Sequence, residues 1–413
     1  MPISFFRRIS TPVFALACIG IQLAAATEPP VLVVPRGGVA MQIAAPAIKL
    51  ADTSGEWELY ELDGAGAVVP AQLSPAMAAD GTPSTDRFRL LASIPPSSAG
   101  DAPRRFQLRR ATVKTDAAFA MKIAEIDKNS IRIDEGRRPL LVYNHGEITS
   151  SRVPEDDPRR HRACYVHPVR GIDGEVLTDD FPADHYHHHG IFWTWPHVEI
   201  DGRRYDLWSG WDIRQKFVRW MHRRTGPAAA ELAVENGWYA DDLKVMIERV
   251  WIRAYRTAGG ARAIDFEFAF TPTDRPITLR GAEEKSYGGL SMRFNVSSPG
   301  KTIITVPEGR TSDDLLDTRL PWADLSYPFG ADSGPSGAAV FVPPNHPDYP
   351  PTWLTRHFGA LCVGWPGVKG KTFPPGETIR LNYRVWIHKN ALDRDQLQRA
   401  YQGYVEAAKA RWE

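Results

Sequence analysis

Residues 264–270 read Ile-Asp-Phe-Glu-Phe-Ala-Phe, and this stretch decides the fold class. Apolar side chains stand at every second position, which is the period of a β-strand with one face toward a core. Residues 381–387, Leu-Asn-Tyr-Arg-Val-Trp-Ile, repeat the pattern near the other end of the chain. We therefore expect a half-buried strand at each place and a mainly β protein.

Outward from these stretches, short apolar runs broken by turn residues predict further strands along most of the chain. Between residues 30 and 133 the runs are those of a small β-sandwich of roughly one hundred residues. Only the tail is typical of a helix, because apolar residues recur at helical spacing from about residue 393 to 411. The sequence predicts a small β-sandwich domain at residues 27–135 and a larger, mainly β domain at residues 136–413.

The composition limits the classes of partner. The chain has 413 residues, with 50 Lys and Arg against 49 Asp and Glu, so its net charge is +1. A near-neutral balance argues against nucleic acid or an anionic membrane as the main partner. The 34 Pro and 33 Gly residues fit many tight turns between short strands.

The first 26 residues are typical of a secretory signal peptide. Arg7 and Arg8 precede an apolar run at residues 11–23, and three alanines follow at 24–26. No later run is apolar for the ~18 residues of a membrane span. We expect a periplasmic or secreted protein in which Cys164 and Cys362 either pair or stay buried as free thiols.

Residues 179–197 hold five of the twelve histidines and two of the thirteen tryptophans, Trp193 and Trp195. Imidazole titrates near neutrality, so it can serve as base, acid or metal ligand. On an extended backbone His185, His187 and His189 would share one face, and they are the candidate ligands for a divalent metal. The other interpretation is that these histidines lie on the surface or are hydrogen-bonded in the core.

A second segment, residues 283–293, places carboxylates, an ammonium, a phenol and a guanidinium around Gly288 and Gly289. Glycine lets backbone or ligand approach closely, so the segment is a candidate wall of the same site. A strand-edge bulge with solvated charges explains it equally well. His357, in Thr355-Arg356-His357-Phe358-Gly359, is interpreted as structural.

These motifs resemble a bacterial family of exported proteins that is described as a domain of unknown function and often labelled methane oxygenase. The resemblance rests on residues 165–169, on 178–191 with the core Asp184-His185-x-His187-His188, on 284–290, and on the final strand. It covers roughly residues 140–406. Family members usually have Pro at the position of Tyr186 and Arg at that of His189, so His189 does not take a family role.

The methane-oxygenase label conflicts with the sequence, because particulate methane oxygenases are polytopic membrane proteins and no span follows the signal peptide. The resemblance implies instead that the larger domain is an antiparallel β-supersandwich, similar to galactose-mutarotase-like and polysaccharide-lyase folds, with a C-terminal helix. Relatives of this kind occur in bacteria that degrade complex carbohydrates. This is fold-level analogy.

The preferred hypothesis is a carbohydrate-active enzyme, either a glycoside hydrolase or a polysaccharide lyase. A hydrolase would use Asp184 and Glu284 as its carboxylate pair. A lyase would use a histidine as base, with Tyr287 protonating the leaving oxygen. The alternatives are a non-catalytic carbohydrate-binding protein and a metal-dependent oxidoreductase.

The candidate residues divide into two groups. The catalytic candidates are Asp184, His185, His187, His188, Glu284 and Tyr287. The substrate-binding candidates are His167, Trp193, Trp195, Lys285 and Arg293.

Overall fold

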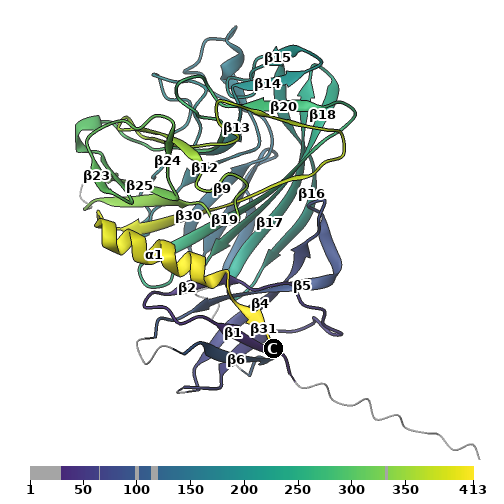
Figure 1. Ribbon diagram of the computed structural model, residues 1–413, viewed down its shortest axis with the longest axis vertical. Helices are drawn as coiled ribbons and strands as arrows, with labels where there is room; N and C mark the ends of the chain where they lie inside the picture. Colours follow the sequence, from purple (N-terminus) through teal and green to yellow (C-terminus); the bar gives the residue numbers. More distant parts are fainter. Residues whose placement is uncertain (1–28, 65, 98–101, 113–119, 331–333) are drawn as a thin grey trace, which may run out of the picture.

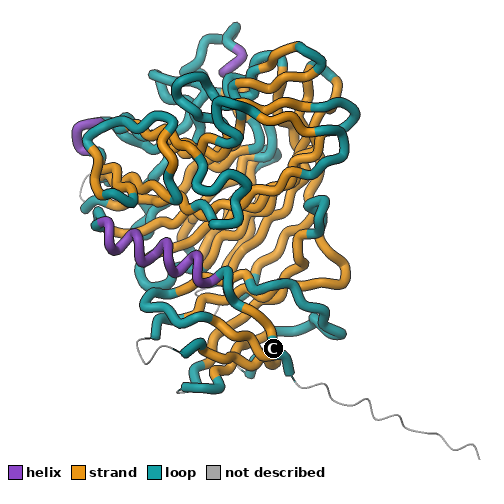
Figure 2. The backbone as a smooth tube through the Cα atoms, viewed as in Figure 1, coloured by secondary structure: helices purple, strands orange, loops and turns teal. Residues whose placement is uncertain are grey.

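Strands make up 53% of the computed structural model and helix 5%, so the mainly β prediction is confirmed (Figure 2). The structure describes residues 29–64, 66–97, 102–112, 120–330 and 334–413. The predicted signal peptide at 1–26 lies outside these residues. Within them, no helix is both long and apolar enough to span a bilayer.

Two nine-stranded antiparallel sheets dominate the described part of the chain (Figure 1). In order across the first sheet, the strands are β24 (Thr318–Arg319), β27 (Thr352–Arg356), β28 (Ala360–Gly364), β21 (Gly289–Arg293), β13 (Ile191–Thr194), β12 (Tyr165–Val169), β9 (Arg138–Asn144), β8 (Ser130–Glu135) and β7 (Met121–Glu125). Across the second they are β16 (Ile213–Thr225), β17 (Ala229–Ala240), β18 (Leu243–Tyr255), β19 (Ala261–Pro272), β30 (Ile379–Lys389), β26 (Ser336–Phe341), β25 (Trp322–Tyr327), β22 (Ile303–Val306) and β23 (Gly309–Thr311).

Three smaller sheets and one α-helix complete the described fold. A seven-stranded sheet contains β2 (Met41–Ala44), β5 (Pro83–Ile94), β4 (Val68–Met77), β3 (Trp57–Glu61), β6 (Arg104–Arg110), β1 (Val31–Val34) and β31 (Arg411–Trp412). A four-stranded sheet contains β15 (Arg203–Tyr205), β14 (His197–Ile200), β20 (Ile277–Arg280) and β29 (Lys371–Phe373), and β10 (Ile148–Thr149) pairs with β11 (His161–Arg162).

The predicted C-terminal helix is α1 (Arg394–Ala407), which begins after a capping box formed by Asp393 and Gln396. It contacts β2 of the seven-stranded sheet and β26 of the second nine-stranded sheet, and it runs between the two parts in Figure 1. The chain then returns to the seven-stranded sheet, where β31 pairs with β1.

Strand pairing shows where the chain passes from one sheet to the next. Strands β1 to β6 belong to the seven-stranded sheet, whereas β7 pairs with β8, and β8 with β9, in the first nine-stranded sheet. The change of sheet therefore falls between Arg110 and Met121, before the boundary that we predict at residue 135. The boundary as a domain limit stays a prediction.

The two nine-stranded sheets pack face to face around one apolar core. Ile264, Phe266, Phe268 and Phe270 of β19 all point into it, as the alternation of residues 264–270 predicts. Side chains of β13, β21 and β28 meet them from the first sheet within the same cluster. Burial of both apolar faces is the main stabilising contribution to this arrangement.

A buried carboxylate, that of Glu248, lies inside this core. Glu248 of β18 is fully buried, and its oxygens accept hydrogen bonds from the indoles of Trp193 and Trp238 and from the amides of Gln215 and Asn236. The donor distances are 2.6–2.8 Å. Burial raises the pKa of Glu248 above its ordinary value, although the four donors oppose the shift.

The polar face of β19 is buried, although the alternating pattern of the sequence suggests that it faces solvent. Glu267 on this face is 8% exposed and forms ion pairs with Arg253 at 2.6 Å and with Arg89 of β5 at 2.6 Å. Arg253 also contacts Glu231 at 2.8 Å, and Ser74 of β4 donates to that carboxylate. This buried ion cluster joins the seven-stranded sheet to the outer face of the second nine-stranded sheet.

We predict that Arg253→Met lowers the free energy of unfolding by about 3–5 kcal/mol, because it leaves buried carboxylates without their partner. The matched control is Arg203→Met, which breaks a pair with Asp212 whose side chains are 54% and 68% exposed. The control should cost less than about 1 kcal/mol. Urea denaturation of both variants measures the difference, and equal losses would contradict the role given to the cluster.

Candidate functional site

The histidine-rich segment forms the connection between β12 and β13 and is not extended. The amide of His185 donates to Pro182 O at 3.0 Å, and the amide of His188 donates to His185 O at 2.9 Å. These successive turns break the alternation that an extended backbone would give. His185, His187 and His188 therefore contact one another, whereas His189 points elsewhere.

Three imidazoles pack as a cluster. The rings of His185 and His188 stack with centroids 4.6 Å apart and planes 6° apart. His187 stands perpendicular to both, at 5.7 Å from His185 and 4.8 Å from His188. We call His185, His187 and His188 the histidine cluster.

Aromatic side chains from loops distant in sequence surround the histidine cluster. Phe358, in the turn between β27 and β28, stacks on His185 at 5.0 Å. The indole of Trp208 meets His188 edge-on at 5.8 Å, and Tyr287 lies 4.5 Å from Trp208. The aromatic wall thus comes from three loops that the sheets bring together.

Arg293 of β21 fixes the start of the segment. Its Nη2 donates to both oxygens of Asp184 at 2.9 and 3.0 Å, and its Nη1 lies 3.5 Å from Nδ1 of His188. Nδ1 of His185 lies 3.0 Å from Asp184 Oδ2. Burial raises the pKa of Asp184, but His185 and Arg293 outweigh it and hold that pKa below the ordinary value.

Two imidazoles of the histidine cluster, those of His187 and His188, are uncharged at neutral pH. Burial, followed by repulsion from His185, lowers the pKa of His187 to about 3. Burial and the neighbouring imidazoles also lower the pKa of His188 well below its ordinary value. Within the described residues the ring of His187 forms no hydrogen bond, and its Nδ1 is buried without a partner.

His189 has a different environment from the cluster. Its Nδ1 lies 2.7 Å from Oδ1 of Asp180, and the hydroxyl of Tyr165 donates to Oδ2 of the same carboxylate at 2.8 Å. Burial lowers the pKa of His189 to about 4, although Asp180 opposes the shift. Asp180, which the sequence analysis did not select, is a buried residue that holds the segment in place through these two contacts.

Gly190 ends the segment because the chain passes very close to β12. A Cβ at this position would lie 2.1 Å from the carbonyl oxygen of Val166. Only glycine permits this approach.

The predicted tryptophans lie away from the cluster. Trp193 and Trp195 are buried in the core between the sheets, where Trp193 donates to Glu248 and Trp195 donates to Trp365 O at 2.6 Å. The tryptophan beside the histidines is Trp208. It is one of seven tryptophans between residues 193 and 251, so composition alone does not single it out.

Of the candidate residues in segment 283–293, two lie at the site, namely Tyr287 and Arg293. Glu284 and Lys285 are exposed, and their side chains make no hydrogen bond or ion pair with the described residues. Glu283 instead contacts His197 at 2.7 Å and Arg280 at 2.7 Å. Sequence reasoning missed Phe358. It lies directly after His357, a residue that the sequence analysis interprets as structural.

The remaining predictions concern His167, the cysteines and a metal. His167 lies 3.0 Å from Thr178 Oγ1, and burial lowers its pKa. Cys164 and Cys362 are both buried and free. Among the described residues, no group of three or more His, Cys, Asp or Glu side chains is arranged to hold a metal ion.

Chemically, the site combines neutral imidazoles, a phenol, a paired guanidinium and aromatic rings. Burial raises the pKa of Tyr287, so its phenol keeps its proton at neutral pH. The arrangement can accept a proton at an imidazole, donate one from a phenol and attract an anion.

Two comparisons with known proteins bear on the site. The description "Family of unknown function (DUF6807)" belongs to the family whose sequence model matches residues 130–402. This range includes the whole histidine cluster, Tyr287, Arg293 and Phe358. No curated protein matches the chain.

We predict that the protein loses stability as pH falls from about 7 to 5. A buried histidine whose pKa is depressed stays neutral in the folded chain, whereas the unfolded chain takes up a proton below about 6.5. The stability is therefore complete above that pH and is lost below it, at about 2 kcal/mol per buried imidazole by pH 5. Urea denaturation at the two pH values, for wild type and His189→Gln, measures the contribution of His189.

The His189→Gln substitution should make the loss of stability between pH 7 and pH 5 smaller. His388→Gln should make this loss larger. Burial lowers the pKa of His388, but the buried carboxylate of Asp324 outweighs this effect and raises that pKa above its ordinary value. Stability from His388 is present at low pH and is lost as pH rises. The same pH dependence in all three proteins would refute the assignment.

Proposed function

The chain belongs to the family of unknown function DUF6807, and we propose that it is an exported enzyme that cleaves uronate-containing glycans by β-elimination. The family resemblance predicted from the motifs is thereby confirmed, and it assigns no activity. Export rests on the predicted signal peptide. The activity rests on the histidine cluster and its neighbours.

One observation carries the proposal: buried, uncharged imidazoles lie beside the guanidinium of Arg293, and the protonated phenol of Tyr287 packs against Trp208, which also contacts His188. A base must be deprotonated at working pH, and His187 and His188 meet that condition because their pKa values are lowered. Their low basicity makes them weak proton acceptors. A substrate carboxylate bound among them would raise their pKa values and so make them stronger bases, which favours an anionic sugar as the substrate.

The elimination follows from these groups. An imidazole nitrogen of the cluster takes the proton from the carbon beside the uronate carboxylate. The electron pair forms a carbon–carbon double bond, and the glycosidic carbon–oxygen bond breaks. Tyr287 gives its proton to the leaving oxygen, and exchange with water restores both groups.

Hydrolysis by a carboxylate pair has less support. A general acid needs a raised pKa, whereas that of Asp184 is lowered and the carboxylate is held by Arg293. Glu284 is exposed and has no contact with Asp184. Asp184 and Arg293 are better suited to positioning the cluster.

We expect the full chain, incubated with polygalacturonate, alginate or hyaluronan, to release an unsaturated product whose conjugated double bond absorbs in the far ultraviolet. Tyr287→Phe should lower kcat by about 100-fold or more and change KM little, because it removes only the proton donor. The matched control is Tyr349→Phe, which removes a hydroxyl bonded to Tyr401 and should leave kcat unchanged.

Other outcomes reject the proposal in specific ways. Binding without product, equal in wild type and Tyr287→Phe, identifies a carbohydrate-binding protein. New reducing ends without a double bond indicate hydrolysis. Activity that a chelator abolishes and a divalent metal restores indicates metal chemistry.

A further inference from the structure

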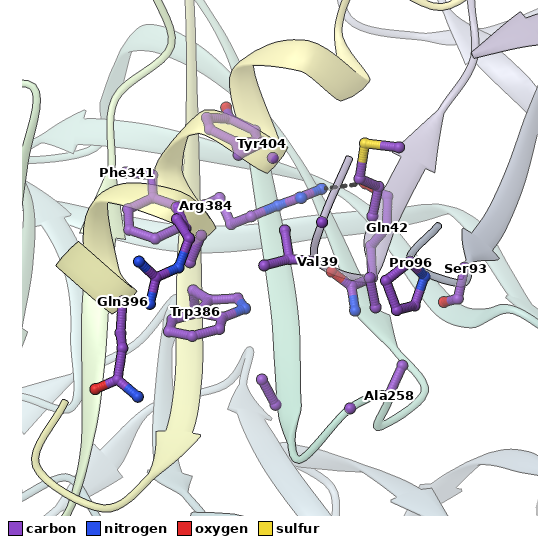
Figure 3. A pocket seen from close by; sticks show the side chains of 18 of the residues that line it. Val39, Gln42, Ser93, Pro96, Ala258, Phe341, Arg384, Trp386, Gln396 and Tyr404 are labelled. Carbon is purple, nitrogen blue, oxygen red and sulfur yellow. Dashed lines mark hydrogen bonds between the residues drawn. The ribbon is translucent and has the colours of Figure 1, made fainter. Parts of the chain in front are cut away.

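A cavity of about 500 Å³ lies between the seven-stranded sheet, strand β30 and helix α1 (Figure 3). Its walls come from residues 38–42, the end of β5, the turn between β18 and β19, and the inner side of α1. None of its lining residues belongs to the histidine cluster. The volume is in the range of sites for small organic ligands.

Two polar side chains of the cavity lack partners within the described part of the chain. Gln42 and Ser93 are directly opposite each other on β2 and β5, so both face the cavity. Gln42 is only 3% exposed, and its side-chain amide has no hydrogen-bond partner among the described residues. The hydroxyl of Ser93 is buried and has none either. Figure 3 shows the Gln42 amide beside Val39 and Pro96. Leaving a buried hydroxyl such as that of Ser93 unbonded is costly, which points to a ligand.

An aromatic surface stands in the same cavity. The indole of Trp386 stacks on Phe341 at 5.9 Å, with planes 22° apart. Both rings line the cavity, and the indole N–H has no partner among the described residues. An aromatic face with nearby amides suits the apolar face and hydroxyls of a sugar ring.

The charges of the cavity favour an anion. Arg384 is fixed, because it donates to Asp265 at 2.6 and 2.8 Å and to Gln42 O at 3.0 Å. Arg399 of α1 is exposed, lines the cavity and pairs with no acid in the described residues. A free guanidinium at the rim can bind a carboxylate with two hydrogen bonds.

We propose that this cavity is a second saccharide-binding site that takes one anionic sugar unit, a uronate. The sugar ring lies against Trp386, its hydroxyls bond to Gln42 and Ser93, and its carboxylate pairs with Arg399. The site is separate from the histidine cluster and performs no chemistry. It would hold a glycan chain on the protein whether or not the cluster cleaves it.

Calorimetric titration of the Tyr287→Phe chain with digalacturonate tests this site without turnover. Its methyl ester serves as the neutral probe. Arg399→Gln, added to that chain, should weaken digalacturonate binding about tenfold and leave the ester unaffected. Gln42→Leu should weaken both probes about tenfold, and Arg411→Gln, an exposed arginine on β31, should change neither.

Digalacturonate that does not bind, or that binds equally to the Arg399→Gln and Arg411→Gln proteins, overturns the proposal. Circular dichroism of each variant establishes that the chain remains folded. Failure of the elimination activity would leave these titrations unaffected, because they require no product. Conversely, loss of binding here does not remove the unsaturated product formed at the histidine cluster.

Discussion

The buried carboxylate of Glu248 sets the orientation on which the candidate site depends. It accepts a hydrogen bond from the indole of Trp193. The face of β13 that carries Trp193 must therefore turn toward the core. Phe192 then faces the opposite side, where it lies 4.9 Å from Trp208. A slip of one residue would exchange these faces and displace the histidines just before the strand.

Burial of charge organises the rest of the molecule. The outer face of the second nine-stranded sheet carries Glu231, Arg253 and Glu267, whose charges compensate one another beneath the seven-stranded sheet. His187 and His188 avoid the same cost differently, because their imidazoles remain neutral.

Periodicity predicted the fold where side chains alternate regularly, as at residues 264–270, and it located the C-terminal helix. The pairing of strands could not follow from it, because β1 pairs with β31 and β13 with β21 through contacts distant in sequence. The density of histidines identified the right segment. Composition could not place Trp208 and Phe358 beside it, because both lie in turns whose positions depend on how the strands pair. It could not place Trp193 in the core either, because strand register decides which face that ring occupies.

The account requires that the imidazoles of His187 and His188 be neutral in the folded protein. Nitrogen-15 NMR of histidine-labelled full chain, titrated from neutral pH downward, reads the protonation of each ring directly. We predict that both rings remain neutral at about pH 5, well below the usual midpoint. Rings that gain their protons near pH 6.5 would contradict the account.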